Sequence, residues 1–339
     1  MMLELEILLL TNNVVFPFQQ FFKDDKLNFV ELNKLFATQL LAEHGLGFLI
    51  NIYEKNSSKS KNTLIKQIIF DTGGPNNTFI HNLDVFNFPL YELDMILLSH
   101  WHYDHFGSLY KILERTDQKV AVIAHEHALF ERIFKRSRNI NNEDLIGKSK
   151  EDLQSLISSS KIVIQEPLNV DRIEQSKGEL SFQKDVIEIF KMDDFRILLS
   201  GEIPRKNDYE NFEGFFSIQN HTAQADQIID DKCLIFEFEE KVLVLCGCCH
   251  SGIVNTLNYV VKLTKKPISH VLGGFHMANV PQSRFNFTLD YLMKLKKYKD
   301  LLYLFPIHCS GEYITEFINR KQSDNLKAVN ASVGSVFKF

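Results

Sequence analysis

The chain of 339 residues is poor in several residue types: it has 8 prolines, 15 glycines, five cysteines and one tryptophan. Three of the cysteines, Cys246, Cys248 and Cys249, crowd one segment, and their total is odd, which argues against a disulfide framework. The short apolar run 8–10 follows acidic residues, so we expect no secretory signal. These absences favour a reducing compartment, and we expect a cytoplasmic protein.

The sequence also lacks long apolar runs and an excess of positive charge. No run approaches the ~20 apolar residues that a membrane helix needs, and the formal net charge of −5 supplies no basic field for nucleic acid. We therefore expect no membrane and no nucleic-acid partner, while a homo-oligomer is compatible with the sequence. With 45% hydrophobic residues and no linker rich in proline, glycine or serine, residues 1–339 are expected to form a single domain.

The most informative segment reads His-Trp-His-Tyr-Asp-His over residues 100–105 and directly follows a strand-like apolar run. If the strand continued, His100, His102 and Asp104 would lie on one side of it. His105 breaks this alternation where a helical apolar pattern over 109–113 begins. A histidine-rich surface loop is the alternative, but three imidazoles and a carboxylate at a strand end are typical of a metal site for zinc, with manganese or iron also admitted.

Other strand-like runs end in a histidine as well. The apolar run 241–246 leads to Gly-Cys-Cys-His, so that His250 follows a buried strand, and Ser251 resembles the N-cap of the next helix. The runs 268–272 and 302–305 lead in the same way to His276 and His308. We expect each of these histidines to lie at the tip of a strand.

The segment 100–105 resembles the signature of the metallo-β-lactamase superfamily. Further stretches, which occur in one order from about residue 3 to residue 339, resemble one branch of it, the metal-dependent hydrolases similar to 7,8-dihydropterin-6-methyl-4-(β-D-ribofuranosyl)-aminobenzene-5'-phosphate synthase. These stretches are Ala42-Glu43-His44-Gly45-Leu46-Gly47, Phe70-Asp71-Thr72-Gly73, Ser200-Gly201-Glu202-Ile203-Pro204-Arg205, Gly247-Cys248-Cys249-His250-Ser251-Gly252, Gly273-Gly274-Phe275-His276 and His308-Cys309-Ser310-Gly311.

The resemblance implies an α/β fold, a four-layer αββα sandwich with the metal site at one edge between its two sheets. It also implies one or two divalent ions, zinc or alternatively manganese or iron. Many members of the superfamily have a bridging aspartate where this chain has Cys248, which is either a thiolate ligand or a small apolar filler. The implied ligands are His100, His102, Asp104, His105, His250 and His308, with Cys248 as an additional candidate.

Other polar residues of these motifs are candidates for catalysis and substrate binding. Asp71, in the Asp-Thr-Gly turn, is expected to orient a ligand histidine. Arg205 has the guanidinium fork that binds a phosphate or carboxylate, although a salt bridge would explain it equally well. His276 is either a substrate contact or a further ligand. The catalytic candidates are Asp104, Glu43 and His44, and the substrate-binding candidates are Arg205, Glu202 and His276.

The branch resemblance implies a metal-dependent hydrolase or a dihydropterin-phosphate synthase-like enzyme. Its substrate would be a phosphorylated or pterin-like small molecule, attacked through metal-activated water or Lewis-acid catalysis. Hydrolysis and condensation both remain open, because they require similar ligands. The alternative function is a non-catalytic metal- or ligand-binding protein on the same scaffold, and the missing bridging carboxylate at Cys248 is the reason to keep it.

Overall fold

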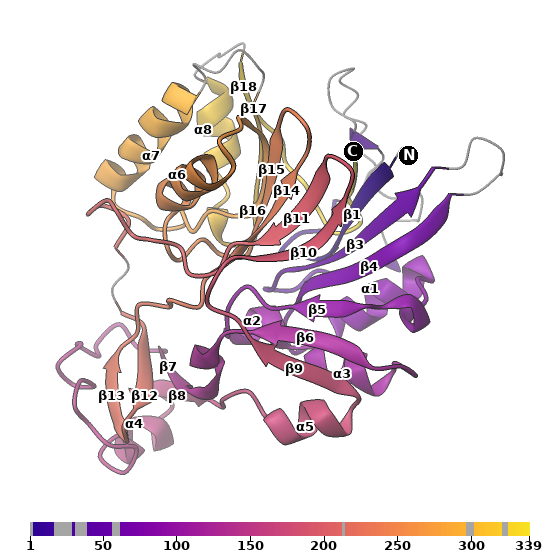
Figure 1. The fold of residues 1–339 in the computed structure, drawn as a ribbon. Coiled ribbons are helices and arrows are strands. Elements are labelled where there is room, and N and C mark those ends of the chain that lie inside the picture. The colour runs from indigo at the N-terminus through magenta and orange to yellow at the C-terminus, as the bar shows by residue number, and fades with distance from the viewer. Residues whose placement is uncertain are drawn as a thin grey trace.

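The computed structural model describes residues 3–16, 29–30, 39–55, 62–211, 214–295, 302–320 and 325–339. Within these residues, two large sheets lie next to each other and carry helices on their outer sides (Figure 1). The strands of the first sheet are, in sheet order, β2 (Phe29–Val30), β19 (Val336–Lys338), β1 (Leu3–Thr11), β3 (Gly47–Glu54), β4 (Thr63–Thr72), β5 (Met95–Leu97), β6 (Val120–Ala124) and β9 (Gly178–Phe182).

The second sheet combines an antiparallel half with a parallel half. β14 and β15 pair antiparallel, whereas β15, β16, β17 and β18 run parallel. The order of its strands is β10 (Ile187–Met192), β11 (Phe195–Leu199), β14 (Cys233–Glu237), β15 (Val242–Cys246), β16 (Ile268–Gly274), β17 (Leu302–Ile307) and β18 (Leu326–Ala328).

Both sheets are buried on both faces, which explains their continuous apolar strands. In β1, Ile7 and Leu9 join the core between the sheets, while Leu8 and Leu10 join the layer beneath the outer helices. β15 alternates in the same way, with Leu243 turned toward the inter-sheet core and neighbouring residues turned toward the outer layer. The predicted αββα sandwich is therefore confirmed.

The outer layers consist of short helices with one apolar face. Those on the first sheet are α1 (Thr78–Phe86), α3 (Leu109–Glu114) and α5 (Val170–Gln175), and those on the second are α6 (Ile253–Thr264), α7 (Gln282–Leu295) and α8 (Ile314–Arg320). The predicted N-cap at Ser251 is wrong. The N-cap residue of α6 is Gly252, and its φ of 94° favours glycine at that position. No helix among the described residues is both long and apolar enough to cross a membrane.

A small sheet stands apart from the sandwich, at the lower left of Figure 1. It is assembled from two stretches of chain that are separated by β9, β10 and β11, and it has an apolar core of its own, which includes Ile133 and Phe216. Its elements are β13 (Thr222–Ala225), β12 (Phe216–Gln219), β7 (Glu131–Lys135), β8 (Ile162–Gln165) and the helix α4 (Gln154–Ser158).

Candidate metal centre

The polar motifs meet where the parallel strands of both sheets end. β4, β5 and β6 of the first sheet run parallel, and so do β15, β16 and β17 of the second, so their carboxyl ends lie at one edge of each sheet. Asp71 is the penultimate residue of β4, and His250, His276 and His308 follow β15, β16 and β17. The strand-end histidines therefore gather at the same edge as Asp71.

Asp71 organises the histidines of the first sheet. Its Oδ1 accepts the Ser99 backbone N–H at 2.7 Å, and its Oδ2 accepts both the Ser99 hydroxyl and His105 Nδ1–H at 2.7 Å. Because the Ser99 proton is donated to Asp71, Ser99 Oγ accepts Nδ1–H of His100 at 2.9 Å. Nε2 of His100 is thereby left with its lone pair, and Nε2 of His105 is turned to Cys248 Sγ at 3.1 Å.

Burial keeps several of these imidazoles neutral. Desolvation, reinforced by the neighbouring imidazoles, holds the pKa values of His100, His102 and His250 well below the ordinary value. His100 Nε2 lies 3.0 Å from His102 Nδ1, and the ring of His250 lies 4.7 Å from that of His100 between centroids. Neutral imidazole is the form that binds a transition metal.

The period-two interpretation places Asp104 in a continued strand. In the structure, Asp104 instead lies in the short helix α2 (Tyr103–Phe106). Its Oδ2 lies 3.2 Å from His44 Nε2, 3.3 Å from His308 Nε2 and 3.8 Å from His105 Nε2. Burial opposes its ionisation, but these histidines outweigh burial and hold the pKa of Asp104 well below its usual range. A carboxylate surrounded by three imidazoles is a suitable cation ligand.

His308 is held in place by the first strand of the chain. Its backbone N–H donates to Asn12 Oδ1 at 3.0 Å, and its Nδ1 pairs with Asn13 Oδ1 at 3.1 Å. Because an amide oxygen can only accept, Nδ1 carries the proton and Nε2 faces Asp104. The φ of 55° at His308 places this residue in the left-handed region, at a cost that the surrounding contacts must offset.

Cys248 lies at the middle of the centre. Its sulfur belongs to three groups whose ligand atoms all lie within 4.8 Å of one another, while a fourth group joins Asp104 to two histidines. The donor set of imidazoles, a carboxylate and a thiol fits a borderline ion such as zinc better than magnesium or calcium. The groups are His100–Cys248–His250, His105–Cys248–His308, Cys248–His276–Cys309 and His44–Asp104–His308.

His44 and His276 join the centre, whereas Glu43 turns away from it. The half-exposed ring of His44 stacks on that of His308 at 4.9 Å, and the ring of His276 lies 4.4 Å from that of His250. The carboxylate of Glu43 accepts the backbone N–H groups of Gly74 at 3.1 Å and Asn76 at 3.2 Å. In this arrangement Glu43 anchors the loop that follows β4.

Glu202 and Arg205 lie beside the centre. Glu202 pairs with His125 Nε2 at 3.1 Å. Arg205 donates to the backbone carbonyls of Gln227 and Ile228 and lines a cavity of about 540 Å³. Phe215 lines the same cavity and also packs on the rings of His102 and His250, at 5.5 Å and 5.1 Å. Phe215 thus connects the cavity that Arg205 lines to the histidines.

The small sheet supplies residues that the sequence analysis does not single out. Arg132 of β7 is buried and pairs with Asp230 at 2.7 Å and Asp226 at 3.3 Å, while its Nη1 lies 3.4 Å from His102 Nε2. Asp230 in turn accepts the backbone N–H of Trp101 at 2.8 Å. Asp226, Asp230 and Asp231 cluster before a buried strand, which is the one signal in the sequence that could have indicated this network.

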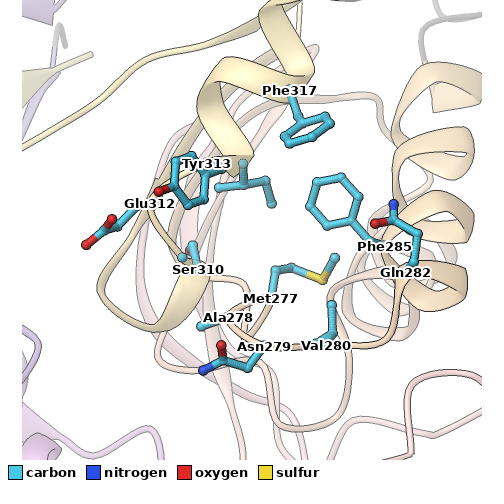
Figure 2. A pocket seen from close by; sticks show the side chains of 12 residues that line it. Met277, Ala278, Asn279, Val280, Gln282, Phe285, Ser310, Glu312, Tyr313 and Phe317 are labelled. Carbon is cyan, nitrogen blue, oxygen red and sulfur yellow. The ribbon is translucent and has the colours of Figure 1, made fainter.

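A pocket of about 430 Å³ adjoins the turns that carry His276 and Cys309. Its walls come from the residues that directly follow these two and from α7 and α8, and Figure 2 shows Met277, Phe285 and Phe317 around its interior. The turns are tied together by the Ala278 N–H, which donates to the Cys309 carbonyl at 3.2 Å. The pocket can therefore hold an aromatic or apolar group of a ligand next to the centre.

The fold and the donor set define a class, that of αββα proteins with a metal-binding site at the sheet ends. Residues 64–183 match the family model of the metallo-beta-lactamase superfamily. Over 276 residues the chain is 32% identical to the "Uncharacterized protein MJ0448" of Methanocaldococcus jannaschii, covering 80% of this chain and 86% of that protein. The chain belongs to the metallo-β-lactamase superfamily.

Two further similarities bear on the branch and on the fold. The 7,8-dihydropterin-6-methyl-4-(beta-D-ribofuranosyl)-aminobenzene-5'-phosphate synthase of Methanocaldococcus jannaschii is 26% identical over 304 residues, which cover 88% of this chain and 90% of the synthase. Tm1679, described as a metal-dependent hydrolase of the β-lactamase superfamily, has a crystal structure that matches with a TM-score of 0.65 at 19% identity. That match covers 99% of this chain and 98% of Tm1679 and shows the shared fold.

Proposed function

We propose that this protein is a metal-dependent enzyme that acts on a phosphorylated or pterin-like small molecule. The observation that carries this proposal is the convergence of imidazoles, the Asp104 carboxylate and the Cys248 thiol within 4.8 Å in each ligand group. His100, His250 and Cys248 would hold one ion, with His102 beside His100 as a further ligand, and Asp104, His105 and His308 would hold a second. When bound, such ions act as Lewis acids that polarise a substrate oxygen and lower the pKa of water toward ~7.

The chain's own residues supply proton transfer and positioning. The hydrogen bond with Asp104 raises the pKa of His44, and His44 is also half-exposed, so its ring can exchange a proton with a substrate at the mouth of the site. Asp71 and Asn13 hold His105 and His308 by their Nδ1 atoms, so that the Nε2 atoms face the reacting group. This division of roles suits the transfer or hydrolysis of a phosphate ester.

Support for a substrate with a flat ring comes from the pocket in Figure 2. Phe285 and Phe317 meet edge to face with centroids 5.1 Å apart, and Tyr313 is 66% exposed beside them. Aromatic side chains bind a flat heterocycle by stacking. The relative named as a dihydropterin-related phosphate synthase fits the same substrate class.

The second candidate is a metal- or ligand-binding protein without turnover. It is favoured by one observation, that a thiol stands where a bridging carboxylate would hold two ions together. The buried donor groups are equally compatible with it, so metal binding alone does not separate the two functions. A measurement of phosphate-ester turnover separates the two functions.

The first test is the metal content of untagged protein, measured by elemental mass spectrometry and compared with that of the variant H102A. We expect one or two zinc, manganese or iron ions per chain, and a loss of at least one ion in H102A because His102 Nδ1 faces the centre. The matched control is H270Q, since His270 is also buried but lies at the other end of β16, against Tyr303.

Wild-type protein is then assayed for phosphate release from aromatic and pterin phosphomonoesters. Metal-dependent turnover that H102A abolishes and H270Q retains would support the enzyme. Bound metal without turnover of any ester would favour the binding protein. Unchanged metal content in a folded H102A would contradict both candidates.

A further inference from the structure

The second sheet places a thiol-rich group beside the imidazole centre. Cys248 follows β15, His276 follows β16 and Cys309 lies in the turn η4 (His308–Ser310) after β17, and these three strands are neighbours that run parallel. In that register Cys246 pairs with Gly273, and Gly274 pairs with Ile307, so the three turns start at one level. The two sulfur atoms and one ring nitrogen lie within 4.8 Å of one another.

The backbone around this group leaves room for sulfur. A Cβ at Gly274 would lie 2.5 Å from the Gly247 carbonyl oxygen, 2.6 Å from Cys309 Sγ and 3.2 Å from Cys248 Cα, so both the backbone and the thiol would have to move. Gly274 therefore permits the close approach of Cys309 to the Cys248 turn, where its Sγ lies 3.6 Å from the Cys248 carbonyl oxygen. Both the Gly247 backbone and the Cys309 thiol thus require a glycine at this position.

The third member, His276, is fixed by its backbone. Its φ of 48° lies in the left-handed region, and its carbonyl accepts from the buried Arg284 at 3.4 Å. A non-glycine residue in this conformation is strained and is retained where the surrounding structure determines it. The turn thereby keeps the imidazole next to both sulfur atoms.

We propose that Cys248, His276 and Cys309 form a third ligand set, which binds a thiophilic divalent cation such as zinc. Two thiolates and an imidazole are typical zinc ligands and leave a fourth position for a solvent or substrate atom. On binding, the two thiols release their protons to solvent. This inference goes beyond the proposed phosphate-ester activity, with which it shares Cys248; the other ligands of that activity are imidazoles and a carboxylate.

Because Cys248 also belongs to the two sets of the imidazole centre, the third set competes with them for its sulfur. An ion between Cys248 and Cys309 draws this sulfur toward the second sheet and leaves His100 and His250 to bind their ion without it. Zinc would therefore occupy both the third ligand set and the imidazole centre. Manganese, which has little affinity for thiolates, would occupy only the imidazole and carboxylate ligands.

The test uses cobalt(II) as a spectroscopic probe of sulfur ligation in the full-length, reduced and chelator-treated protein. We expect wild-type protein to develop the near-ultraviolet band of thiolate-to-cobalt charge transfer. C309A should lose about half of this intensity at saturation, because one of two thiolates is removed, while the double variant C248A/C309A should lose the rest. H276A should keep the band but require several-fold more cobalt for half-saturation.

C233A is the matched control, since Cys233 of β14 is a buried thiol that packs in the apolar layer of the second sheet, and its band should equal that of the wild type. C309S, which retains the size of the side chain, replaces C309A if the circular dichroism of that variant shows unfolding. A full wild-type band in folded C309A or C309S would overturn the proposal, and so would cobalt binding to the wild type without any sulfur band. That last outcome would leave the imidazole centre, and with it the proposed function, intact.

Discussion

Asp231 is a buried carboxyl group beside the centre, 1% exposed, and its Oδ2 accepts the backbone N–H of Ser251 at 2.8 Å. Burial raises its pKa to about 6, although the hydrogen bonds from Ser251 and the charge of Arg205 oppose this shift. In the unfolded chain the group titrates near ~3.9. The folded state therefore binds the proton more tightly, and this contribution to stability is complete below pH ~4 and is lost as pH rises through about 6.

We predict that D231N removes this loss. Asparagine keeps an oxygen that can accept the Ser251 N–H, and it carries no charge at any pH. Relative to the wild type, its free energy of unfolding should increase by about 2 kcal/mol between pH 4 and pH 7, since one pKa unit corresponds to ~1.4 kcal/mol and part of the shift already acts at pH 4. Urea denaturation of chelator-treated protein across this range measures the difference.

D117N is the control for this comparison, because the side chain of Asp117 is 99% exposed, and its pH profile should parallel that of the wild type. A D231N profile that also runs parallel to the wild type would contradict the raised pKa of Asp231.

At the scale of elements, the small sheet acts as a support for the ligand segment. β7 contributes Arg132, whose contact with Asp230 reaches the backbone of Trp101, and Phe134, whose ring meets that of His102 edge to face at 5.3 Å. Both contacts brace the segment that carries His100 and His102. A sheet outside the sandwich thereby stabilises the position of ligands that belong to the first sheet.

We predict that R132M destabilises the protein by about 3–5 kcal/mol, because it leaves the buried Asp226 and Asp230 without their cation. Its apparent zinc affinity should fall as well, since the His102 segment loses its brace. Equilibrium unfolding in urea and zinc titration against a chromophoric chelator measure the two effects. R138M, at an exposed arginine that follows β7, should change neither value. Wild-type stability of R132M would exclude the bracing role.

The elements differ in how well the sequence predicts them. The apolar strands β5, β6, β14, β15 and β17 are recognisable because both of their faces are buried. The strands of the small sheet are short and half-exposed, and they come from two distant stretches, so no local pattern marks them. Side-chain directions are also beyond sequence reasoning. Glu43 and Glu202 belong to the right motifs, but their carboxylates bind Gly74, Asn76 and His125.

The gathering of the strand-end histidines is accessible to sequence reasoning, because parallel strands bring their carboxyl ends together. The central place of Cys248 could not be predicted, because it depends on how the two sheets approach each other: its sulfur meets His105 of the first sheet at 3.1 Å across 143 positions of sequence. Cys309 has no spacing that marks it as a partner of Cys248. Only the register of β15, β16 and β17 brings the two turns together.

At the scale of the whole molecule, the centre joins the two sheets. Its ligands come from both, so we propose that residues 1–339 unfold as one unit whose stability depends on metal. Zinc at 100 times its dissociation constant should raise the free energy of unfolding by about 2.7 kcal/mol, in a single transition. Differential scanning calorimetry with and without a chelator tests this. H270Q should show the same zinc effect, whereas H102A should show a smaller one. Two separate transitions, of which zinc shifts only one, would contradict the single unit.

The contact between Asn13 and His308 spans 295 positions, almost the whole chain. About 200 residues separate His105 from His308, and at synthesis rates of roughly 5–20 residues per second the ribosome needs about 10–40 s to cover them. During that interval the nascent chain already displays His100, His102 and His105 but cannot yet enclose an ion between two sheets. Enclosure of an ion between the two sheets therefore requires that the chain has been synthesised through His308.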